Sequence, residues 1–338
     1  MKKLAITMGE PGGVGPEIII KALSSSEVRS CCRPVVIGDA FAMGAAVKLC
    51  KSPLRLRIIR SPEEATTTKG LINIIHVIPH SPPLQKWGKE KIKTEIFKKN
   101  KPTAEGGKAC VNYIKRAVEL ALSKQVGGIV TAPISKEALK MAGVTWPGHT
   151  EMLAELTDTK DYAMMLVGGP LRVILVTIHT ALKNVPDLIT KKRIKKTIRL
   201  AKMACDMLRI KKPRIAVAGL NPHAGEAGIF GDEELKKIIP AIREAGKEGI
   251  HVSGPFPPDT IFHKAYQGEV DIIVCMYHDQ GLIPLKMIAF DKGVNVTVGL
   301  PFVRTSPDHG TAYDIAWKGI ADPSSMIEAI KLAVRLNV

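Results

Sequence analysis

The strongest constraint on the fold is a recurring pattern of short runs of aliphatic and β-branched residues. Each run is followed by a loop of glycine, proline or small polar residues, and then by apolar residues at helical spacing. This order is typical of βα units, which build a parallel sheet covered by helices. We therefore predict an α/β fold. The predicted strands cover residues 3–7, 127–131, 171–178, 214–218 and 271–277, and the predicted helices cover residues 137–142, 151–156 and 232–245.

The length of 338 residues exceeds what one hydrophobic core usually spans, which indicates two domains or one large α/β unit. Hydrophobic residues make up 45% of the chain and charged residues 24%, a balance that excludes disordered and collagen-like chains. The sequence has no run of about 18 apolar residues and no apolar segment typical of a signal peptide at its start. The six cysteines form no C-x-x-C pair, which favours reduced thiols. We expect a cytoplasmic protein without a membrane span.

The formal net charge of +17 indicates attraction to anions without identifying the anion. In the densest basic run, residues 191–208, apolar residues recur at helical spacing. We interpret this run as the solvated face of an amphipathic helix, because a nucleic-acid surface would add stacking aromatic residues. A second lysine-rich stretch, residues 86–107, lacks periodicity and is predicted to be an exposed connector. The cations of the first run are Lys191, Lys192, Arg193, Lys195, Lys196, Arg199 and Lys202, and its apolar residues are Ile194, Ile198, Ala201, Cys205 and Leu208.

Histidines stand where three of the predicted strands end. His179, His223 and His278 each follow an apolar run directly or within a few residues. Ligands of open α/β sheets bind outside the carboxyl ends of the strands, so these three side chains can converge. Neutral imidazole is the commonest protein ligand of zinc and related divalent ions, and three histidines leave one position open for substrate. This placement favours a metal site over three isolated structural histidines.

A glycine-rich loop, residues 9–16, follows the first predicted strand. A dinucleotide fingerprint starting at Gly13 would need glycine in place of Ile18, and a P-loop starting at Gly9 would need glycine in place of Val14. Neither pattern is met. We interpret the loop as backbone that shapes a ligand cleft, with a plain tight turn as the alternative.

Residues 148–151, Gly-His-Thr-Glu, begin a predicted helix that suits an anionic substrate. There, the side chains of His149 and Thr150 and the free backbone N–H groups can hold a phosphate or a carboxylate. Thr150 is also expected to be an ordinary N-cap residue, and both roles can hold at once.

Further polar residues follow in the C-terminal part of the chain. Lys286, Asn295 and Arg304 come after the last predicted strand, where an arginine can bind a carboxylate or phosphate with two hydrogen bonds. Each of the three, taken alone, would be interpreted as a surface residue. The carboxylates of Asp259 and Asp279 suit acid–base catalysis or the support of a metal ligand.

Together, five segments resemble the 4-hydroxythreonine-4-phosphate dehydrogenase family of vitamin B6 synthesis. They are residues 9–17, 131–136, 148–151, 221–226 and 277–281, and the resemblance runs from about residue 4 to about residue 321. Glu10 and Gly12 stand where the family commonly has aspartate and alanine. Residues 309–316 are similar to the adenosine-binding loop of the isocitrate and isopropylmalate dehydrogenase group, in which the cofactor is held without a Rossmann fingerprint.

The resemblance implies an NAD-dependent oxidation of 4-phosphohydroxy-L-threonine at C3, with NADP as a possible substitute for NAD. Decarboxylation of the resulting β-keto acid would leave 3-amino-2-oxopropyl phosphate, a step of pyridoxal 5′-phosphate biosynthesis. One divalent ion, zinc, magnesium or cobalt, would serve both steps.

The resemblance also implies roles for residues that match the family's motifs. The metal ligands would be His179, His223 and His278, contributed by both subunits of a homodimer. The substrate and its phosphate would be bound by His149, Thr150, Lys286, Asn295 and Arg304. The nicotinamide cofactor would be bound by His309, Gly310, Thr311 and Asp314. Asp259 and Lys286 would be the catalytic groups, with Asp259 helping to take the hydroxyl proton.

The family's architecture implies two α/β/α domains of the isocitrate/isopropylmalate dehydrogenase type with a catalytic cleft between them. The first domain would comprise residues 1–140 and 305–338, so that both termini contribute to it. The second would comprise residues 141–304 and carry the metal ligands and the dimer contact.

Three other functions remain open at this point. The nearest is a paralogous dehydrogenase acting on D-threonate or D-erythronate 4-phosphate, which needs the same metal, cofactor and phosphate pocket. A zinc hydrolase could also be built from three histidines, but it would have no use for the loop at residues 309–316. A nucleic-acid-binding protein would show affinity that falls steeply with salt. We expect neither nucleic acid nor membrane as a partner.

Overall fold

The computed structural model describes residues 1–77 and 100–338, so residues 86–99 of the predicted connector lie outside the described residues. The end of that prediction is wrong, because α4 (Ala104–Leu122) begins within it. Thr103 caps the helix by accepting a hydrogen bond from the Gly106 N–H at 2.9 Å. Across both described ranges, no helix combines the length and the apolar character needed to cross a membrane.

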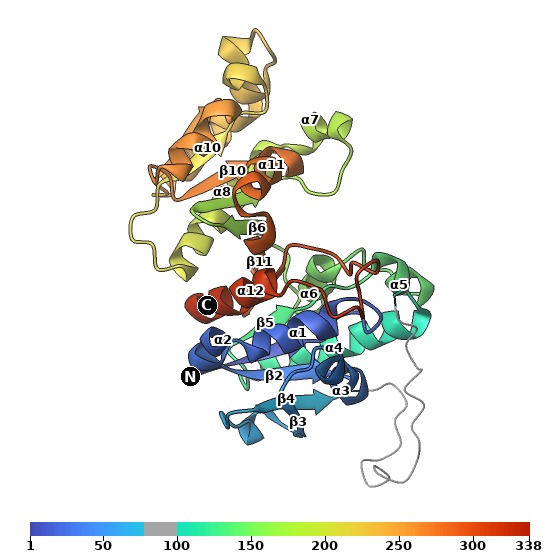
Figure 1. Ribbon diagram of the computed structural model, residues 1–338. Helices are drawn as coiled ribbons and strands as arrows, with labels where there is room; N and C mark the ends of the chain where they lie inside the picture. Colours follow the sequence, from blue (N-terminus) through green and yellow to red (C-terminus); the bar gives the residue numbers. More distant parts are fainter. Residues whose placement is uncertain (78–99) are drawn as a thin grey trace, which may run out of the picture. The chain divides into compact units, whose positions relative to one another are not determined.

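The chain divides into two compact units (Figure 1). Unit 1 comprises Met1–Asp158 and Pro301–Arg335, and unit 2 comprises Thr159–Leu300 and Leu336–Val338. Each unit contains a layer of strands with helices packed on it. The predicted α/β fold is therefore confirmed.

In unit 1 the strands run in the order β3-β4-β2-β1-β5-β12, and their described pairings are parallel. The carboxyl ends of β1 and β5 are level, because Thr7 lies opposite Thr131. The strands are β1 (Lys2–Thr7), β2 (Cys32–Gly38), β3 (Arg55–Ile58), β4 (Leu71–His76), β5 (Gly128–Thr131) and β12 (Val303–Pro307). The helices include α1 (Gly15–Ser24), α2 (Ser26–Cys31), α3 (Ala40–Leu49), α4, α5 (Lys136–Met141), α6 (His149–Leu156) and α12 (Ser324–Arg335), with a short 3₁₀ turn η1 (Pro62–Glu64).

In unit 2 the strands run in the order β11-β6-β7-β10-β8-β9. They are β6 (Ala163–Gly168), β7 (Leu171–Leu175), β8 (Ile215–Ala218), β9 (Val252–Phe256), β10 (Ile272–Cys275) and β11 (Val294–Val298). The helices are α7 (Val185–Leu188), α8 (Lys191–Met207), α9 (Ile239–Lys247), α10 (Pro258–Tyr266) and α11 (His278–Ala289), with short turns η3 (Leu182–Asn184), η4 (Pro222–Gly228), η5 (Glu234–Ile238) and η6 (Phe290–Lys292).

The prediction of a parallel sheet does not hold for one strand of unit 2. Strand β6 runs antiparallel to both β7 and β11. Gly169, with φ of +54°, and Pro170 make the tight turn of the β6–β7 hairpin. Two apolar runs joined by so short a turn cannot be parallel, because parallel strands need a longer crossover.

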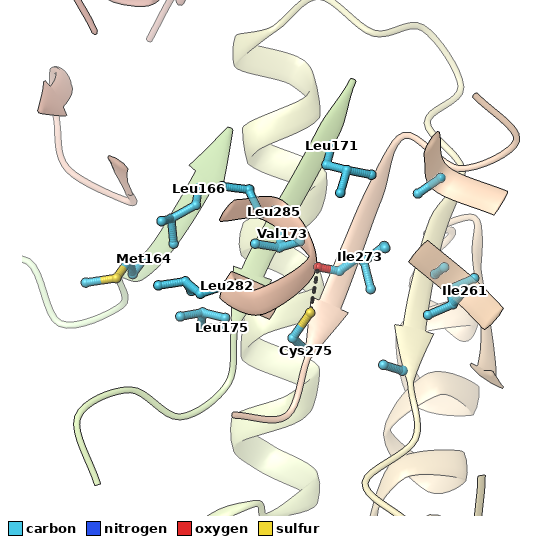
Figure 2. Packing of buried hydrophobic residues seen from close by; sticks show 13 residues of the cluster. Met164, Leu166, Leu171, Val173, Leu175, Ile261, Ile273, Cys275, Leu282 and Leu285 are labelled. Atoms are coloured by element: carbon cyan, nitrogen blue, oxygen red, sulfur yellow. Dashed lines mark hydrogen bonds between the residues drawn. The ribbon is translucent and has the colours of Figure 1, made fainter. Parts of the chain in front are cut away.

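The core of unit 2 lies between its strands and α11 (Figure 2). Leu282 and Leu285 of α11 lie over Leu166, Val173 and Leu175 of the strands, with Cys275 beside them. These side chains are aliphatic or contain sulfur, as the scarcity of aromatic residues predicts. The packing fixes the first turn of α11, and therefore His278, at the carboxyl end of β10.

The predicted amphipathic helix over the basic run is confirmed as α8, whose Ile194, Ile198, Ala201 and Cys205 are buried. Five of its seven cations form ion pairs with acidic side chains of unit 2. Lys191 and Lys195 bind Glu244 at 2.7 and 2.8 Å, and Lys202 binds Asp206 at 2.6 Å. These ion pairs support the interpretation of the run as a solvated face.

The helix predicted at residues 232–245 differs in detail from the observed structure. It begins with the π-helical turn η5 and continues as α9 to Lys247, two residues past the predicted end. Glu234 of the π-helical turn is buried. The wider turn places this carboxylate against the loop after β8, where it accepts hydrogen bonds from backbone N–H groups.

Candidate active site

A buried arginine near the start of β12 lies opposite Ile129 of β5. Arg304 on β12 is only 2% exposed, so its interpretation as a surface residue is wrong. Its Nη2 donates a hydrogen bond to Thr131 Oγ1 at the end of β5, at 2.7 Å. Burial lowers the pKa of Arg304 to about 9, although the nearby charge of Glu151 raises it. A buried cation of this kind is stabilised by an anion, which fits the phosphate or carboxylate expected here.

His149 is the first residue of α6 and lies near this cation. Burial, together with the positive charge of Arg304, holds the pKa of His149 well below its usual value. The ring is therefore neutral at physiological pH. Among the described residues, its buried Nε2 atom has no hydrogen-bond partner. An imidazole nitrogen left without a partner in this way is suited to a polar ligand group.

The prediction that Thr150 caps the helix is wrong. Gly148 is the N-cap residue of α6, in extended conformation and without a side-chain cap, and Thr150 is buried in the first turn. The N–H groups of this turn are therefore not occupied by an N-cap side chain, which preserves their capacity to bind an anion.

The glycine loop lies against the segment predicted to bind the cofactor. The Thr311 carbonyl oxygen accepts a hydrogen bond from the Val14 N–H at 3.0 Å, and Trp317 Nε1 donates to the Pro11 carbonyl oxygen at 3.0 Å. A Cβ atom at Gly13 would lie 3.0 Å from Thr311, so the small residue allows this close approach. The contact favours the interpretation of the loop as a shaping element over a plain tight turn.

The predicted cofactor residues lie on the outer side of this contact. His309 and Asp314 are exposed, Thr311 is half-buried, and open space surrounds the Cα of Gly310. His309 Nδ1 donates to the Gly310 carbonyl oxygen at 2.9 Å, which leaves Nε2 as the acceptor nitrogen. Exposed polar groups beside a glycine loop fit a nicotinamide cofactor with its two phosphates.

Sequence reasoning missed Glu10, a carboxyl group beneath the glycine loop that is only 1% exposed. Burial raises the pKa of Glu10 to about 7, while hydrogen bonds from Gly12 and the Cys110 thiol lower it. The Cys110 Sγ lies 3.7 Å from Glu10 Oε2. The sequence of the loop could have indicated this shifted pKa. A carboxylate in a closely packed loop at a strand end is poorly hydrated, and poor hydration raises its pKa.

The structure brings two of the three predicted metal ligands together. The ring centroids of His179 and His278 are 5.9 Å apart, whereas His223 lies beside Phe230 with a centroid distance of 6.0 Å. In the described part of the chain, no group of three or more histidine, cysteine or acidic side chains is arranged to hold an ion. His179 and His223 are exposed, and His278 is half-buried.

The donor set at His278 has the chemistry of a metal ligand. Asp279 Oδ1 accepts a hydrogen bond from His278 Nδ1 at 2.7 Å. This bond fixes the tautomer and leaves Nε2 as the nitrogen that can bind an ion, as is usual for metal-bound histidines. Two exposed or half-buried imidazoles side by side, one of them oriented by a carboxylate, fit a divalent ion.

The remaining predicted residues of unit 2 lie on separate elements. Lys286 on α11 is half-buried, with Nζ 5.6 Å from the centre of the Phe290 ring. Asn295 on β11 is half-buried, and its buried Oδ1 has no hydrogen-bond partner among the described residues. Asp259 is exposed in the first turn of α10. Thr131, which accepts the hydrogen bond from Arg304, belongs to the family-like segment 131–136 but was not predicted as a site residue.

Polar and ionisable side chains at the strand ends of an α/β scaffold are typical of enzymes that act on small molecules. The family model described as "Pyridoxal phosphate biosynthetic protein PdxA" matches residues 30–333. The chain belongs to this family, which confirms the resemblance seen in its motifs.

Similar proteins agree over almost their whole lengths. A 4-hydroxythreonine-4-phosphate dehydrogenase from Trichlorobacter lovleyi is 49% identical, with 99% of this chain and 97% of that protein covered. A D-threonate 4-phosphate dehydrogenase from Pectobacterium atrosepticum is 46% identical, with 99% of each chain covered. The crystal structure of a 4-hydroxythreonine-4-phosphate dehydrogenase from Klebsiella pneumoniae is similar at a TM-score of 0.88, with 44% identity and 98% of each chain covered.

These findings confirm the predicted enzyme class, a dehydrogenase. A dehydrogenase of this family implies a nicotinamide cofactor. The names of these relatives specify two phosphorylated small molecules. 4-Hydroxythreonine 4-phosphate is an amino acid, and D-threonate 4-phosphate is a sugar acid. Both predicted functions, the amino-acid enzyme and its sugar-acid paralogue, are therefore represented among close relatives.

Proposed function

We propose that this chain oxidises 4-phosphohydroxy-L-threonine at C3 with NAD and a divalent ion, and then decarboxylates the product to 3-amino-2-oxopropyl phosphate. The family match and the 49% identical relative support this reaction. The observation that carries the proposal within the chain is the buried Arg304 beside the neutral His149, because this pair suits an anionic, hydrogen-bonding substrate.

The residues proposed to bind the substrate are His149, Thr150, Lys286, Asn295 and Arg304. In unit 1, Arg304 binds the phosphate, and His149 and Thr150 donate hydrogen bonds at the start of α6. In unit 2, Asn295 and Lys286 bind polar groups of the substrate, an assignment supported by the partnerless Oδ1 of Asn295. The cation of Arg304 is already desolvated, so it can bind a phosphate without first losing its own water.

The cofactor would lie on the segment from His309 to Asp314, beside the glycine loop. When bound, the cofactor would supply a hydride acceptor for the oxidation. Thr311 and Gly310 supply backbone and hydroxyl groups, and the exposed carboxylate of Asp314 can accept hydrogen bonds from ribose hydroxyls. We propose NAD as the cofactor, with NADP as a substitute.

The divalent ion, zinc, magnesium or cobalt, would be held by His179, His223 and His278. When bound, it supplies Lewis acidity to the oxygens of the substrate. His278 presents Nε2 because Asp279 holds its Nδ1 proton. Since only His179 and His278 adjoin within the described chain, we propose that the ligands come from both subunits of a homodimer.

Asp259 and Lys286 would be the catalytic side chains. The exposed carboxylate of Asp259 can take the proton of the C3 hydroxyl as the hydride leaves. The ammonium group of Lys286 offsets the negative charge that develops when carbon dioxide is lost. Both side chains belong to unit 2.

The homodimer is supported by an apolar surface on unit 2. Ile283, Met287, Ile288 and Phe290 of α11 and η6 are exposed, and Met287 is 84% exposed. Apolar side chains clustered in this way mark association surfaces. We further propose a two-domain architecture, for which the predicted bounds were residues 1–140 with 305–338 and residues 141–304, whereas the compact units divide after residues 158 and 300. A cytoplasmic location is supported by the six unpaired thiols.

A second candidate is oxidation of D-threonate 4-phosphate or D-erythronate 4-phosphate. The 46% identical relative with the D-threonate name favours it. The same phosphate, metal and cofactor groups would serve, because all of these substrates have a C4 phosphate, a C3 hydroxyl and a carboxylate, and the sugar acids carry a hydroxyl rather than an amine at C2. The residues that face C2 would decide between them.

Replacing His223 by alanine tests the proposal through its metal site. We expect His223→Ala to abolish NADH formation and to lose affinity for Zn²⁺ added alone. His251→Ala is the matched control, because His251 is also an exposed histidine of unit 2 and has no proposed role. Turnover of His223→Ala at the wild-type kcat/KM would overturn the proposed site.

A further inference from the structure

The loop that carries His223 has an unusual backbone. Five consecutive residues, 223–227, have φ values of +51°, +53°, +81°, +39° and +54°. Four of the five are not glycine, and residues with a Cβ atom adopt this left-handed conformation at a cost in energy. The turn gains little from burial, because Gly225 is its only buried residue. Something other than core packing must therefore hold it.

Glu234 supplies much of what holds the turn. Its carboxylate is only 1% exposed. Oε1 accepts hydrogen bonds from the N–H groups of Leu220 and Asn221 at 2.7 and 2.8 Å, and Oε2 accepts one from Asn221 Nδ2 at 2.9 Å. Asn221 Nδ2 also lies 2.7 Å from Glu233 Oε2. The segment leading into the turn is thus fixed to one buried carboxylate.

The turn also packs closely around this carboxylate. A Cβ atom at Gly225 would lie 2.7 Å from Glu234 Oε2, and one at Gly219 would lie 3.1 Å from Oε1. Any larger residue at Gly225 would displace the carboxylate or the turn. The absence of a side chain at Gly219 and Gly225 therefore leaves room for the Glu234 carboxylate. At Gly225 it also permits the positive φ value.

Gln280 ties the same segment to the strand end before His278. Its Nε2 donates to the Gly219 carbonyl oxygen at 2.7 Å, and its Oε1 accepts from the Met276 N–H at 2.6 Å. Gln280 is buried in the first turn of α11, two residues after His278. The start of the His223 loop is thereby held at a fixed position relative to the end of β10.

We propose that Glu234 is a positioning residue for His223: it holds the left-handed turn in the conformation that presents the exposed imidazole to its ligand. This inference rests on the proposed function, in which His223 binds a divalent ion. Glu234 itself contacts neither substrate nor cofactor in this proposal. The hydrogen bonds of its carboxylate offset the energetic cost of the left-handed turn. A loop that only connected β8 to α9 would have no need of five left-handed residues around a buried charge.

The test replaces Glu234 by glutamine, which keeps the shape but has one acceptor oxygen in place of two. We expect the affinity for Zn²⁺ alone, measured by competition with a chromophoric chelator, to fall roughly 10- to 100-fold, the range usual for groups that orient metal ligands. Saturating Zn²⁺ should restore the wild-type kcat, because His223 itself is intact. Hydrogen exchange at the Leu220 and Asn221 amides of the metal-free protein should accelerate.

Asp271→Asn is the matched control, because Asp271 accepts a hydrogen bond from the Arg214 N–H at the opposite end of β8, at 2.7 Å. It should leave Zn²⁺ affinity unchanged. If Glu234→Gln does not fold, Asn221→Ala removes only the bonds from Asn221 Nδ2 and should still weaken Zn²⁺ binding measurably. That variant then decides the question.

The outcomes separate the two proposals. If His223→Ala binds Zn²⁺ as wild type does, the metal-ligand assignment in the proposed function fails. If His223→Ala loses Zn²⁺ while Glu234→Gln binds it at wild-type affinity, the positioning role is overturned and the proposed function stands. Faster exchange at residues 220 and 221 without a change in Zn²⁺ affinity overturns the positioning role as well.

Discussion

Arg304 and Glu10 are two ionisable side chains of unit 1 that are buried and whose pKa values are shifted by burial. Arg304 remains a cation with a lowered pKa, and Glu10 is a carboxyl group that titrates near neutral pH. Glu10 follows the carboxyl end of β1, and Arg304 donates to Thr131 at the carboxyl end of β5, where a ligand is expected. Buried ionisable groups at such a position are typical of functional sites.

Glu10 should make the stability of the protein depend on pH. Its pKa rises from 4.5 to about 7 on folding because of burial. The folded state then binds the proton more tightly than the unfolded state, so stability is full below pH 4.5 and falls as pH rises to about 7. Between pH 5 and pH 8, denaturant unfolding should show wild type losing about 2 to 3 kcal/mol relative to Glu10→Gln. Glu119→Gln, at an exposed carboxylate on α4, should show no such difference.

Arg304→Met should weaken binding of the phosphorylated substrate. The substitution keeps an unbranched side chain of similar length but removes the charge that would bind the phosphate. We expect kcat/KM to fall roughly 10- to 100-fold, the loss expected for a charge-assisted hydrogen bond. Arg116→Met, on the solvent side of α4, serves as the control. Equal kcat/KM values for the two variants would contradict the proposal that Arg304 binds the phosphate.

At the scale of elements, α8 shows which features the sequence could predict. Its apolar spacing of three and four residues predicted both the helix and its buried face, because periodicity reports directly which side packs on the core. The β6–β7 hairpin was missed, since short apolar runs do not specify strand direction. The π-helical turn at Glu234 was also missed, because it depends on a buried carboxylate bonding to a loop distant in sequence.

The buried face of α8 gives a direct stability prediction. Ile198 is fully buried, whereas Met203 on the same helix is 46% exposed. Ile198→Ala should lower the free energy of unfolding by about 2 to 5 kcal/mol through lost burial and the cavity that remains. Met203→Ala should change it by no more than about 0.5 kcal/mol. Comparable losses measured by denaturant unfolding would show that the helix faces have been assigned wrongly.

The candidate site was predictable to a different extent in each unit. Strand ends are visible in a sequence, so the histidines and the helix start at His149 could be found. The burial of Arg304 could not be, because a single charged residue in a strand is usually at the surface. The neutral state of His149 depends on Arg304, which is 155 positions away in the sequence and is brought near only by the fold.

At the scale of the whole molecule, the proposed homodimer should be visible in solution. Light scattering should give twice the mass of one 36.6 kDa chain. Met287→Lys, which places a charge in the apolar surface of α11, should shift the equilibrium toward monomer and lower turnover together. Met141→Lys alters a methionine of unit 1 that is 54% exposed and should do neither. A wild-type protein that is monomeric at assay concentration while fully active would contradict a shared site.

The central claim is that this chain oxidises a phosphorylated hydroxy amino acid. The most direct test is NADH formation followed by near-ultraviolet absorbance, with 4-phosphohydroxy-L-threonine compared with D-threonate 4-phosphate, with and without chelator. We predict a higher kcat/KM for the amino acid, with turnover lost to the chelator and restored by a divalent ion. Preference for the sugar acid would move the enzyme to the second candidate function, and absence of NADH with either substrate would contradict the account.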